Sequence, residues 1–153
     1  MPGRGIRFRR ARARKKHAPP DSYCTWQSVL LGVEIPKKGG DTFFADQRAA
    51  LAALPADLRQ QIDGLSIKHN AAHDSVGNLR PGFEAFDDPR EAPGAVHAIV
   101  RKHSETGDAC LYLGRREWAY IPGLPLEDSE ALLDELWSYA VPSDYVVEQN
   151  WTP

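Results

Sequence analysis

The sequence predicts a domain built mainly from β-strands with flanking helices, an α+β fold in which the helices pack on the outside of a sheet. The 153 residues are 42% hydrophobic, which is typical of a globular domain that buries a core. Segments with strand and helix patterns follow one another in the order strand, two helices, loop, hairpin, helix, strand. No apolar run approaches the roughly 20 residues of a membrane helix, so we expect no membrane partner.

Charge divides the chain into two parts. Eight of the 19 Lys and Arg residues lie among the first 16 residues, which contain no acid, and this leaves 11 basic against 21 acidic side chains in the remainder. We therefore predict a basic, disordered arm over residues 1–21 and an acidic domain over residues 22–153. The arm could neutralise phosphates. Because the acidic domain repels them and only Phe8 could stack on bases, we do not expect nucleic acid as a partner.

The N-terminal charges and the cysteines indicate a cytoplasmic protein. The basic residues are not followed by the apolar stretch of a signal peptide. The two cysteines, Cys24 and Cys110, are far apart and form no CxxC motif, which favours reduced thiols acting as small apolar residues.

The first half of the domain predicts one strand and two helices. Ser28–Ile35 is apolar and β-branched, and it ends at Pro36 and a Gly-containing turn. Asp46 is a candidate N-cap for a helix through Leu54, and a second helix begins at Pro55 and ends at Gly64. One apolar stripe crosses both helices, formed by Leu51, Leu54, Leu58, Ile62 and Leu65.

The middle of the domain predicts a long loop and a hairpin. Residues 69–93 are polar and interrupted by Gly and Pro, which predicts a long surface loop or lid. Loops of this length without regular structure tend to be functional or disordered. Val96–His103 and Ala109–Leu113 flank a Gly-containing segment of hairpin length. Trp118–Ile121 is expected to form a short strand or a strand-like turn.

The last part predicts a helix and a strand. Glu127–Ala140 has acids in its first turn, and one helical face is apolar. That face consists of Leu132, Leu133, Leu136, Trp137 and Ala140. Tyr145–Trp151 has the pattern of a strand, and it lies at the end of the sequence.

The histidines and arginines give several weak candidates for chemistry. His69 and His73 have the four-residue spacing of two helical zinc ligands, but their segment is not helical and no third ligand stands out; a solvated loop is the alternative. His97 and His103 are expected on the hairpin faces. The pair Arg115-Arg116 could bind an anion or lie on an exposed hairpin rim. The sequence contains no GxSxG, GxGxxG or GxxxxGK[ST] motif.

A turn after the first strand is the strongest candidate for binding. Gly39-Gly40-Asp41-Thr42 follows the strand and precedes a helix. Two glycines allow the backbone to turn tightly beside a ligand, and Asp41 and Thr42 offer oxygen atoms there. The pattern predicts a ligand-binding turn without identifying the ligand.

Four segments together resemble the TauD/TfdA family of iron(II)- and 2-oxoglutarate-dependent dioxygenases, the taurine and dichlorophenoxyacetate dioxygenases. The resemblance runs from about Ser28 to Pro153. The segments are VEIPKKGGDTFFADQRAALAALPADLRQQIDGL, VHAIVRKHSETGDACLYLG, GRREWAYIPGLPLEDSEALLDELWSYA and VVEQNWTP.

The resemblance implies a fold, a reaction and one site residue. The fold would be a double-stranded β-helix (jelly roll) with helices outside it. The reaction would hydroxylate or oxidatively cleave a small-molecule substrate while 2-oxoglutarate and O₂ give succinate and CO₂. Iron(II) would be held by two His and one carboxylate. Thr42 matches the threonine of the GGDT motif, whose hydroxyl contacts 2-oxoglutarate.

Other motifs of the family have no counterpart in this sequence. The HxD motif would fall near Lys15-Lys16-His17, where no HxD exists, and the remaining His and the Arg for the cosubstrate would lie beyond Pro153. We therefore expect no catalytic or metal-ligating residue here, a partial jelly roll lacking its C-terminal strands, and a catalytically inactive fragment. The alternative is a non-catalytic scaffold or interaction protein derived from the fold. The composition of the arm is also that of an out-of-frame translation of GC-rich DNA.

Overall fold

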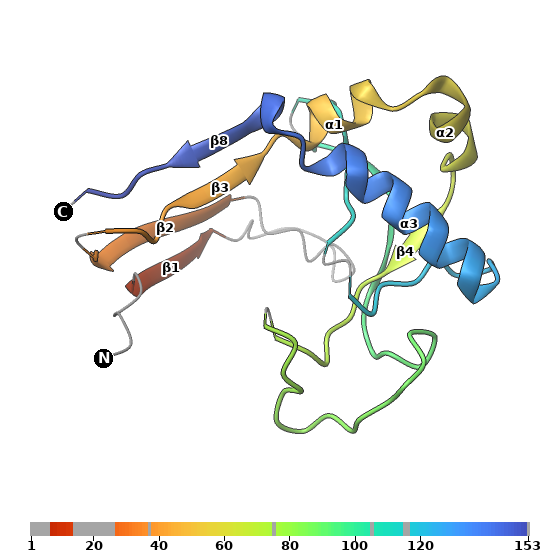
Figure 1. Ribbon diagram of the computed structural model, residues 1–153, viewed down its shortest axis with the longest axis horizontal. Helices are drawn as coiled ribbons and strands as arrows, with labels where there is room; N and C mark the ends of the chain where they lie inside the picture. The colour runs from red at the N-terminus through yellow and green to blue at the C-terminus, as the bar shows by residue number, and fades with distance from the viewer. Residues whose placement is uncertain are drawn as a thin grey trace. The chain divides into compact units, whose positions relative to one another are not determined.

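The computed structural model describes residues 7–13, 27–36, 38–74, 76–104, 106–114 and 117–152, with side chains from Leu30 onward (Figure 1). The chain forms two compact units. The smaller unit consists of residues 1–44 and 147–153, and the larger unit is Ala45–Val146.

The smaller unit is made of paired strands. Strand β1 (Arg7–Ala13) pairs antiparallel with β2 (Gln27–Glu34), in a register that places Phe8 opposite Gly32. Strand β3 (Thr42–Ala45) pairs with β8 (Val146–Gln149), and the two arrows run in opposite directions in Figure 1. The sequence pattern predicted β2 and β8 correctly, although β8 is shorter than expected and Tyr145 belongs to a 3-10 helix.

Strand β1 corrects the expectation of a wholly disordered arm. Arg7–Ala13 lies within that arm and forms a strand along the whole length of β2. The physical reason is that strand pairing satisfies backbone N–H and C=O groups whatever the side chains are. Residues 1–6 and 14–26, the rest of the arm and the start of the predicted domain, lie outside the described residues.

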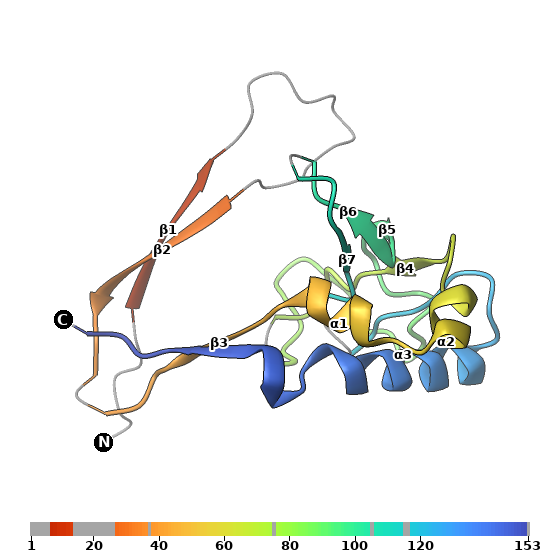
Figure 2. The same ribbon diagram turned by 90° about the horizontal axis from the view of Figure 1, so that it is seen from above.

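The larger unit contains three α-helices and four short strands among its described residues. The helices are α1 (Gln47–Ala53), α2 (Ala56–Gln61) and α3 (Leu126–Ala140), and a 3-10 helix spans Ser143–Tyr145. The strands are β4 (Ser66–Lys68), β5 (Val96–Ala98), β6 (Val100–Lys102) and β7 (Ala109–Leu111). Strand β4 pairs with β5 and β6 with β7, both antiparallel. Figure 2 shows the three helices on one side of these strands.

The predicted hairpin differs from the structure at Ile99. The segment expected to form one strand is divided there, because β5 pairs with β4 while β6 pairs with β7. The Ile99 N–H donates to the carbonyl of Leu65, and the Ile99 carbonyl accepts from the N–H of Tyr112. Ile99 therefore joins the two pairs of strands. The strand expected at 118–121 is reduced to one bridge between Lys68 and Tyr120.

The core of the larger unit lies between the helices and the strands. Its fully buried members come from every layer, including Ile62, Ile67, Ile99, Ile121 and Leu133. The predicted apolar stripe is confirmed: Leu51, Leu54, Leu58 and Ile62 are buried, and Leu65 packs against them. On α3, the predicted face is also confirmed, since Leu132, Leu133, Leu136 and Ala140 are buried and Trp137 is half-buried.

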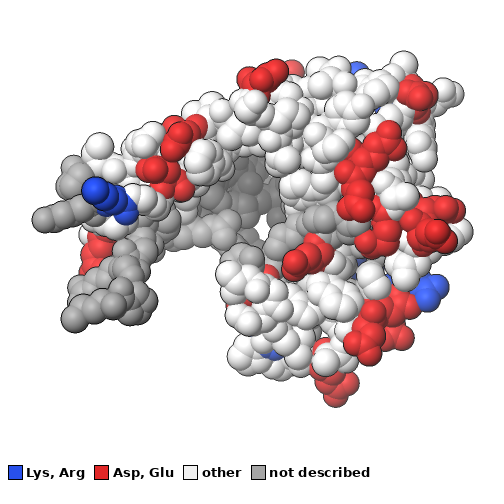
Figure 3. Space-filling model, viewed as in Figure 1, with Lys and Arg blue, Asp and Glu red and all other residues white. Residues whose placement is uncertain are grey.

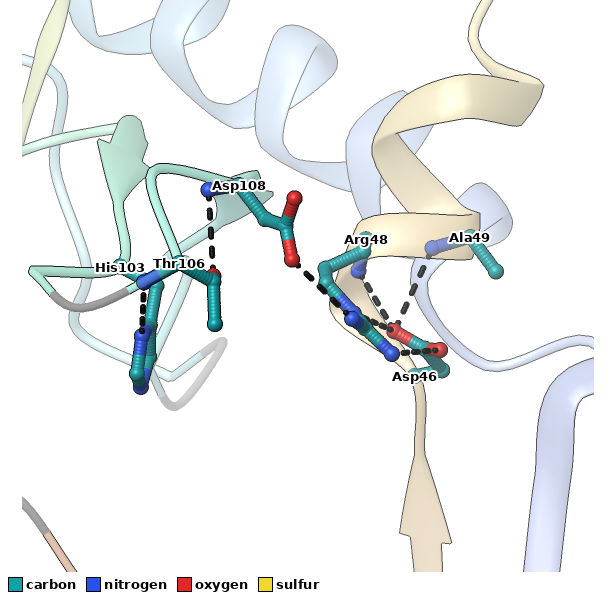
Figure 4. A network of polar contacts seen from close by, with 6 residues as sticks. All are labelled: Asp46, Arg48, Ala49, His103, Thr106 and Asp108. Carbon is teal, nitrogen blue, oxygen red and sulfur yellow. Dashed lines mark hydrogen bonds and ion pairs between the residues drawn. The ribbon is translucent and has the colours of Figure 1, made fainter.

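A polar network holds the start of α1 beside the end of the β6–β7 hairpin (Figure 4). The Asp46 carboxylate accepts from the N–H of Arg48 at 2.9 Å and of Ala49 at 3.4 Å, which confirms the predicted N-cap. The Arg48 guanidinium pairs with both Asp46 and Asp108, each at 3.3 Å. Hydrogen bonds from Arg48 hold the pKa of the Asp46 carboxyl below its usual range. The pKa of Asp108 is also lowered, first by a hydrogen bond with Thr106 and then by Arg48.

Helix α3 carries the acidic character of the larger unit. It contains five acids, Glu127, Asp128, Glu130, Asp134 and Glu135, and no Lys or Arg. In Figure 3, acidic side chains predominate in the region where α3 lies in this view. Among the described residues, no helix has the length and apolar character needed to cross a bilayer.

Candidate functional site

The predicted ligand-binding turn lies in the smaller unit, between β2 and β3. Gly39 has φ 72° and Gly40 has φ 88°, a region that glycine adopts without the steric cost of a Cβ atom. Two such residues in succession reverse the chain and lead it into β3. Asp41 is exposed, and Thr42, the first residue of β3, is half-buried. The turn therefore presents the Thr42 hydroxyl at the beginning of a strand.

The Thr42 hydroxyl has one partner from the other end of the chain. The indole Nε1–H of Trp151 donates to Thr42 Oγ1 at 2.9 Å. Trp151 follows β8, whose pairing with β3 brings the end of β8 to the beginning of β3. The sequence motif predicts a role for Thr42 but gives no sign of this contact, because the two residues are 109 positions apart.

A second group of polar side chains lies in the larger unit and is called the histidine cluster here: His69, His97, Arg101 and Tyr112. The His69 ring lies 5.3 Å from the His97 ring and 5.0 Å from the Tyr112 ring, centroid to centroid. The Arg101 guanidinium lies over the Tyr112 ring at 4.7 Å, a favourable cation–π distance. These residues come from β5, β6 and the segments that follow β4 and β7.

The histidine cluster favours neutral imidazoles. The pKa of His69 is lowered to about 4, mainly by burial and to a smaller extent by the neighbouring His97 and Arg101. The pKa of His97 is also lowered, first by burial and then by Arg101. The Nε2 atom of His69 is buried without a hydrogen-bond partner. A positive charge at His69 would be both desolvated and repelled.

Two glycines allow His69 to occupy this position. A Cβ atom at Gly114 would lie 2.1 Å from Nδ1 of His69, and one at Gly94 would lie 1.5 Å from its carbonyl oxygen. Both distances are far inside van der Waals contact, so any side chain at these positions would displace His69. Gly114 also has φ 67°, a conformation that favours glycine.

His73 belongs to a different cluster. Its ring stacks on Trp118 with an interplanar angle of 6° and a centroid distance of 5.4 Å. Phe86 meets both rings edge-on, at 5.3 Å from His73 and 5.0 Å from Trp118. Trp118 has φ 60°, which is uncommon for a residue other than glycine. The described residues of the 69–93 loop form no strand or helix, as predicted. The ring contacts of His73 and Phe86 with Trp118 connect this loop to the segment after β7.

The described residues do not fit an iron ion. No three or more His, Cys, Asp or Glu side chains among them are grouped so as to hold a metal. His69 and His73 do not form the helical pair that their spacing could have given, because each packs against different aromatic rings. His103 is exposed, and its Nδ1 accepts from the N–H of Thr106.

Of the remaining candidates from the sequence, only Cys110 lies among the described residues. His17, Cys24 and the pair Arg115-Arg116 lie outside the described residues. Cys110 is half-buried as a free thiol, and burial is the main reason that its pKa is raised. A thiol with a raised pKa is a weak nucleophile, which agrees with the expected role as a small apolar residue.

Comparison with known proteins gives one family. The model of the "Taurine catabolism dioxygenase TauD, TfdA family" matches residues 27–153. The α-ketoglutarate-dependent 2,4-dichlorophenoxyacetate dioxygenase of Cupriavidus pinatubonensis is 34% identical over 125 residues, which cover 81% of this chain and 42% of that protein. The (S)-phenoxypropionate/α-ketoglutarate dioxygenase of Sphingobium herbicidovorans is 34% identical over 132 residues, covering 82% of this chain and 45% of that protein.

Solved structures give the same result. A taurine dioxygenase from Burkholderia xenovorans matches with a TM-score of 0.58 and 32% identity, over 77% of this chain and 36% of that one. AAD-2 in complex with Mn(II) and N-oxalylglycine matches with a TM-score of 0.58 and 26% identity, over 73% of this chain and 44% of that one. The chain thus spans less than half the length of these relatives.

Proposed function

Because the chain belongs to the TauD/TfdA family of 2-oxoglutarate-dependent dioxygenases, we propose that it forms part of such an enzyme and that Thr42 contacts the cosubstrate. The observation that carries this proposal is the Gly39-Gly40 turn, which ends in the half-buried hydroxyl of Thr42. A threonine hydroxyl can donate to a carboxylate oxygen. The likeness to AAD-2, whose structure holds N-oxalylglycine, supports a cosubstrate of the dicarboxylate type.

The proposed reaction consumes 2-oxoglutarate and O₂ and releases succinate and CO₂, while a small organic substrate is hydroxylated or oxidatively cleaved. In a complete enzyme of this family, iron(II) would supply the oxygen chemistry. The names of the relatives include phenoxy carboxylic acids, which supports a small organic acid as the substrate class. The jelly roll of this family would supply the remaining walls of the site.

We also propose that the 153 residues alone do not catalyse this reaction. They contain no HxD sequence, and the described residues group no set of metal ligands. The test is an anaerobic titration of the purified chain with Fe(II) in the presence of 2-oxoglutarate. We expect no metal-to-ligand charge-transfer absorption and no succinate after O₂ is admitted. Appearance of that absorption would show a complete iron site and contradict this part of the proposal.

The role of Thr42 has a separate test. Titration of the unaltered chain with N-oxalylglycine, followed by the NMR shift of the Thr42 amide, should show weak binding in the millimolar range, because only part of the site is present. Thr42→Val should reduce the affinity about fivefold or more, since it removes one hydrogen bond to a charged group. Thr42→Ser, which retains the hydroxyl, should bind nearly as well as the unaltered chain.

Thr106→Val is the matched control, because Thr106 is an exposed threonine of the larger unit. It should leave the titration unchanged. Equal binding by Thr42→Val and the unaltered chain would remove Thr42 from the cosubstrate site.

A further inference from the structure

Trp151 lies beside the Thr42 hydroxyl, which the Gly39-Gly40 turn presents. The residue follows the end of β8, and Thr42 opens β3, so the pairing of these two strands sets the two side chains together. The donor is the indole Nε1 and the acceptor is Thr42 Oγ1, at 2.9 Å, which is a normal hydrogen-bond length. Both side chains belong to the smaller unit and are half-buried.

The direction of this hydrogen bond decides what Thr42 can do. An indole nitrogen only donates, so the Thr42 oxygen must accept from it. The hydroxyl hydrogen then has to point elsewhere, away from the indole. One of the two lone pairs of the Thr42 oxygen is engaged by the indole, and the hydroxyl hydrogen remains available to donate in another direction. A donor is the form that a carboxylate ligand requires.

The Trp151 ring also lies near a glycine of the β1–β2 strand pair. Its Cε3 atom lies 3.8 Å from the point where a Cβ atom on Gly32 would stand. The side chain of Ile35 lies closer still to that point, at 3.1 Å. A side chain at position 32 would therefore crowd Ile35, whereas its Cβ atom would stand at an ordinary van der Waals distance from the Trp151 ring. The indole thus lies within reach of β2 as well as of the turn.

We propose that Trp151 is a positioning residue that holds the Thr42 hydroxyl as a hydrogen-bond donor toward a carboxylate of the cosubstrate. This inference rests on the proposed function, which assigns Thr42 to the cosubstrate. Trp151 acts through Thr42 and is not a catalytic residue. Its removal should weaken cosubstrate binding without removing the hydroxyl itself.

The first experiment measures the hydrogen bond without any ligand. The chain contains four tryptophans, and Trp151→Phe identifies the Trp151 indole resonance in a proton–nitrogen NMR spectrum by removing it. In Thr42→Val this resonance should shift, and its N–H should exchange with solvent several times faster. In Thr42→Ser it should stay near its original position. An unchanged resonance and exchange rate in Thr42→Val would overturn the proposal.

The second experiment measures the consequence for binding. Trp151→Phe should weaken N-oxalylglycine about threefold to fivefold, the scale of one neutral hydrogen bond. The double variant Thr42→Val/Trp151→Phe should bind no more weakly than Thr42→Val alone, since the indole acts only through the hydroxyl. Trp137→Phe makes the same chemical change in α3 of the larger unit and should leave the affinity unchanged.

The outcomes separate this inference from the proposed function. If the unaltered chain does not bind N-oxalylglycine, the proposed function fails and the role of Trp151 toward the cosubstrate fails with it, whatever the indole resonance shows. If the unaltered chain binds and Trp151→Phe binds equally well, only the positioning role is overturned. Additive losses in the double variant would likewise show that Trp151 acts on binding by a route other than Thr42.

Discussion

The two units of this chain are stabilised in different ways. Every buried apolar side chain of the described residues belongs to the larger unit. In the smaller unit, the described side chains are half-buried or exposed. Several large apolar residues of the smaller unit are exposed, namely Leu31, Val33, Phe43, Phe44 and Val147. The larger unit has a core, whereas the smaller unit is held mainly by backbone pairing between strands.

This difference shows that the candidate site and the stabilising core are separate parts of the molecule. The Gly39-Gly40 turn, Thr42 and Trp151 lie in the unit without a core, and two-stranded sheets alone are marginally stable in water. The larger unit contains buried leucines and isoleucines from its three helices, from strands β4 and β7 and from segments beside them. Substitutions in the larger unit should therefore change the free energy of unfolding, and substitutions around Thr42 should change ligand binding.

Leucine truncation in each unit tests the comparison most directly and has the largest expected effect. Leu133 is fully buried in α3, whereas Leu31 of β2 is 60% exposed. Leu133→Ala should reduce the free energy of unfolding by about 3 kcal/mol, because it removes a buried side chain and leaves a cavity. Leu31→Ala should change it by less than about 0.5 kcal/mol. Urea denaturation followed by circular dichroism measures both.

Equal losses in the two variants would contradict the comparison, because they would place Leu31 in a stabilising core as well. A large loss of unfolding free energy for Leu31→Ala, with a small loss for Leu133→Ala, would reverse the comparison between the two units.

The histidine cluster predicts a pH dependence that belongs to the larger unit, and we expect this effect to be smaller than that of Leu133→Ala. The folded-state pKa of His69 is about 4, below the ordinary value of 6.5, because of burial and the nearby His97 and Arg101. A lowered histidine pKa contributes stability that is complete above pH 6.5 and is lost as the pH falls toward 4. The described carboxyl groups with lowered pKa values start from 3.8, so their contribution is lost at lower pH.

His69→Asn should flatten the stability profile between pH 6.5 and 4, because asparagine does not titrate. His103→Asn is the control, since His103 is exposed, and it should retain the slope of the unaltered chain. Thermal unfolding monitored at half-unit pH intervals measures the slope. An unchanged slope in His69→Asn would mean that the buried imidazole is not the source of the acid sensitivity.

Local patterns were sufficient to predict several elements. Helix α3 follows from its apolar spacing and its acidic first turn, and α1 follows from the Asp46 cap. Gly39 and Gly40 were correctly expected to form a tight turn before Thr42. Each of these features is decided by interactions within a few residues of sequence, which is the range that periodicity and capping rules describe.

Features that depend on distant contacts were not predicted. Strand β1 was missed because Arg-rich segments carry no apolar alternation, while pairing with β2 uses only the backbone. The division of the hairpin at Ile99 depends on Leu65, and the histidine cluster requires β4 and β5 to meet across the 69–93 loop. The indole of Trp151 reaches Thr42 only after β3 and β8 pair. No local pattern in the sequence indicates any of these long-range contacts.

The smallest expected effect concerns the exposed network at the start of α1. Asp46→Ala removes the cap of the helix and one partner of Arg48, whereas Asp108→Ala removes the other partner of Arg48 and leaves the cap in place. The carboxylates of Asp46 and Asp108 are exposed enough for water to screen their ion pairs with Arg48. The cap, in contrast, also satisfies backbone N–H groups that the helix leaves unpaired. Asp46→Ala should therefore lower the melting temperature slightly, and Asp108→Ala should leave it nearly unchanged.

Raising the salt concentration should not remove the effect of Asp46→Ala, because capping is a local hydrogen bond. A salt-sensitive decrease in melting temperature of equal size in both variants would instead show that the ion pairs of Arg48, and not the cap, stabilise this region.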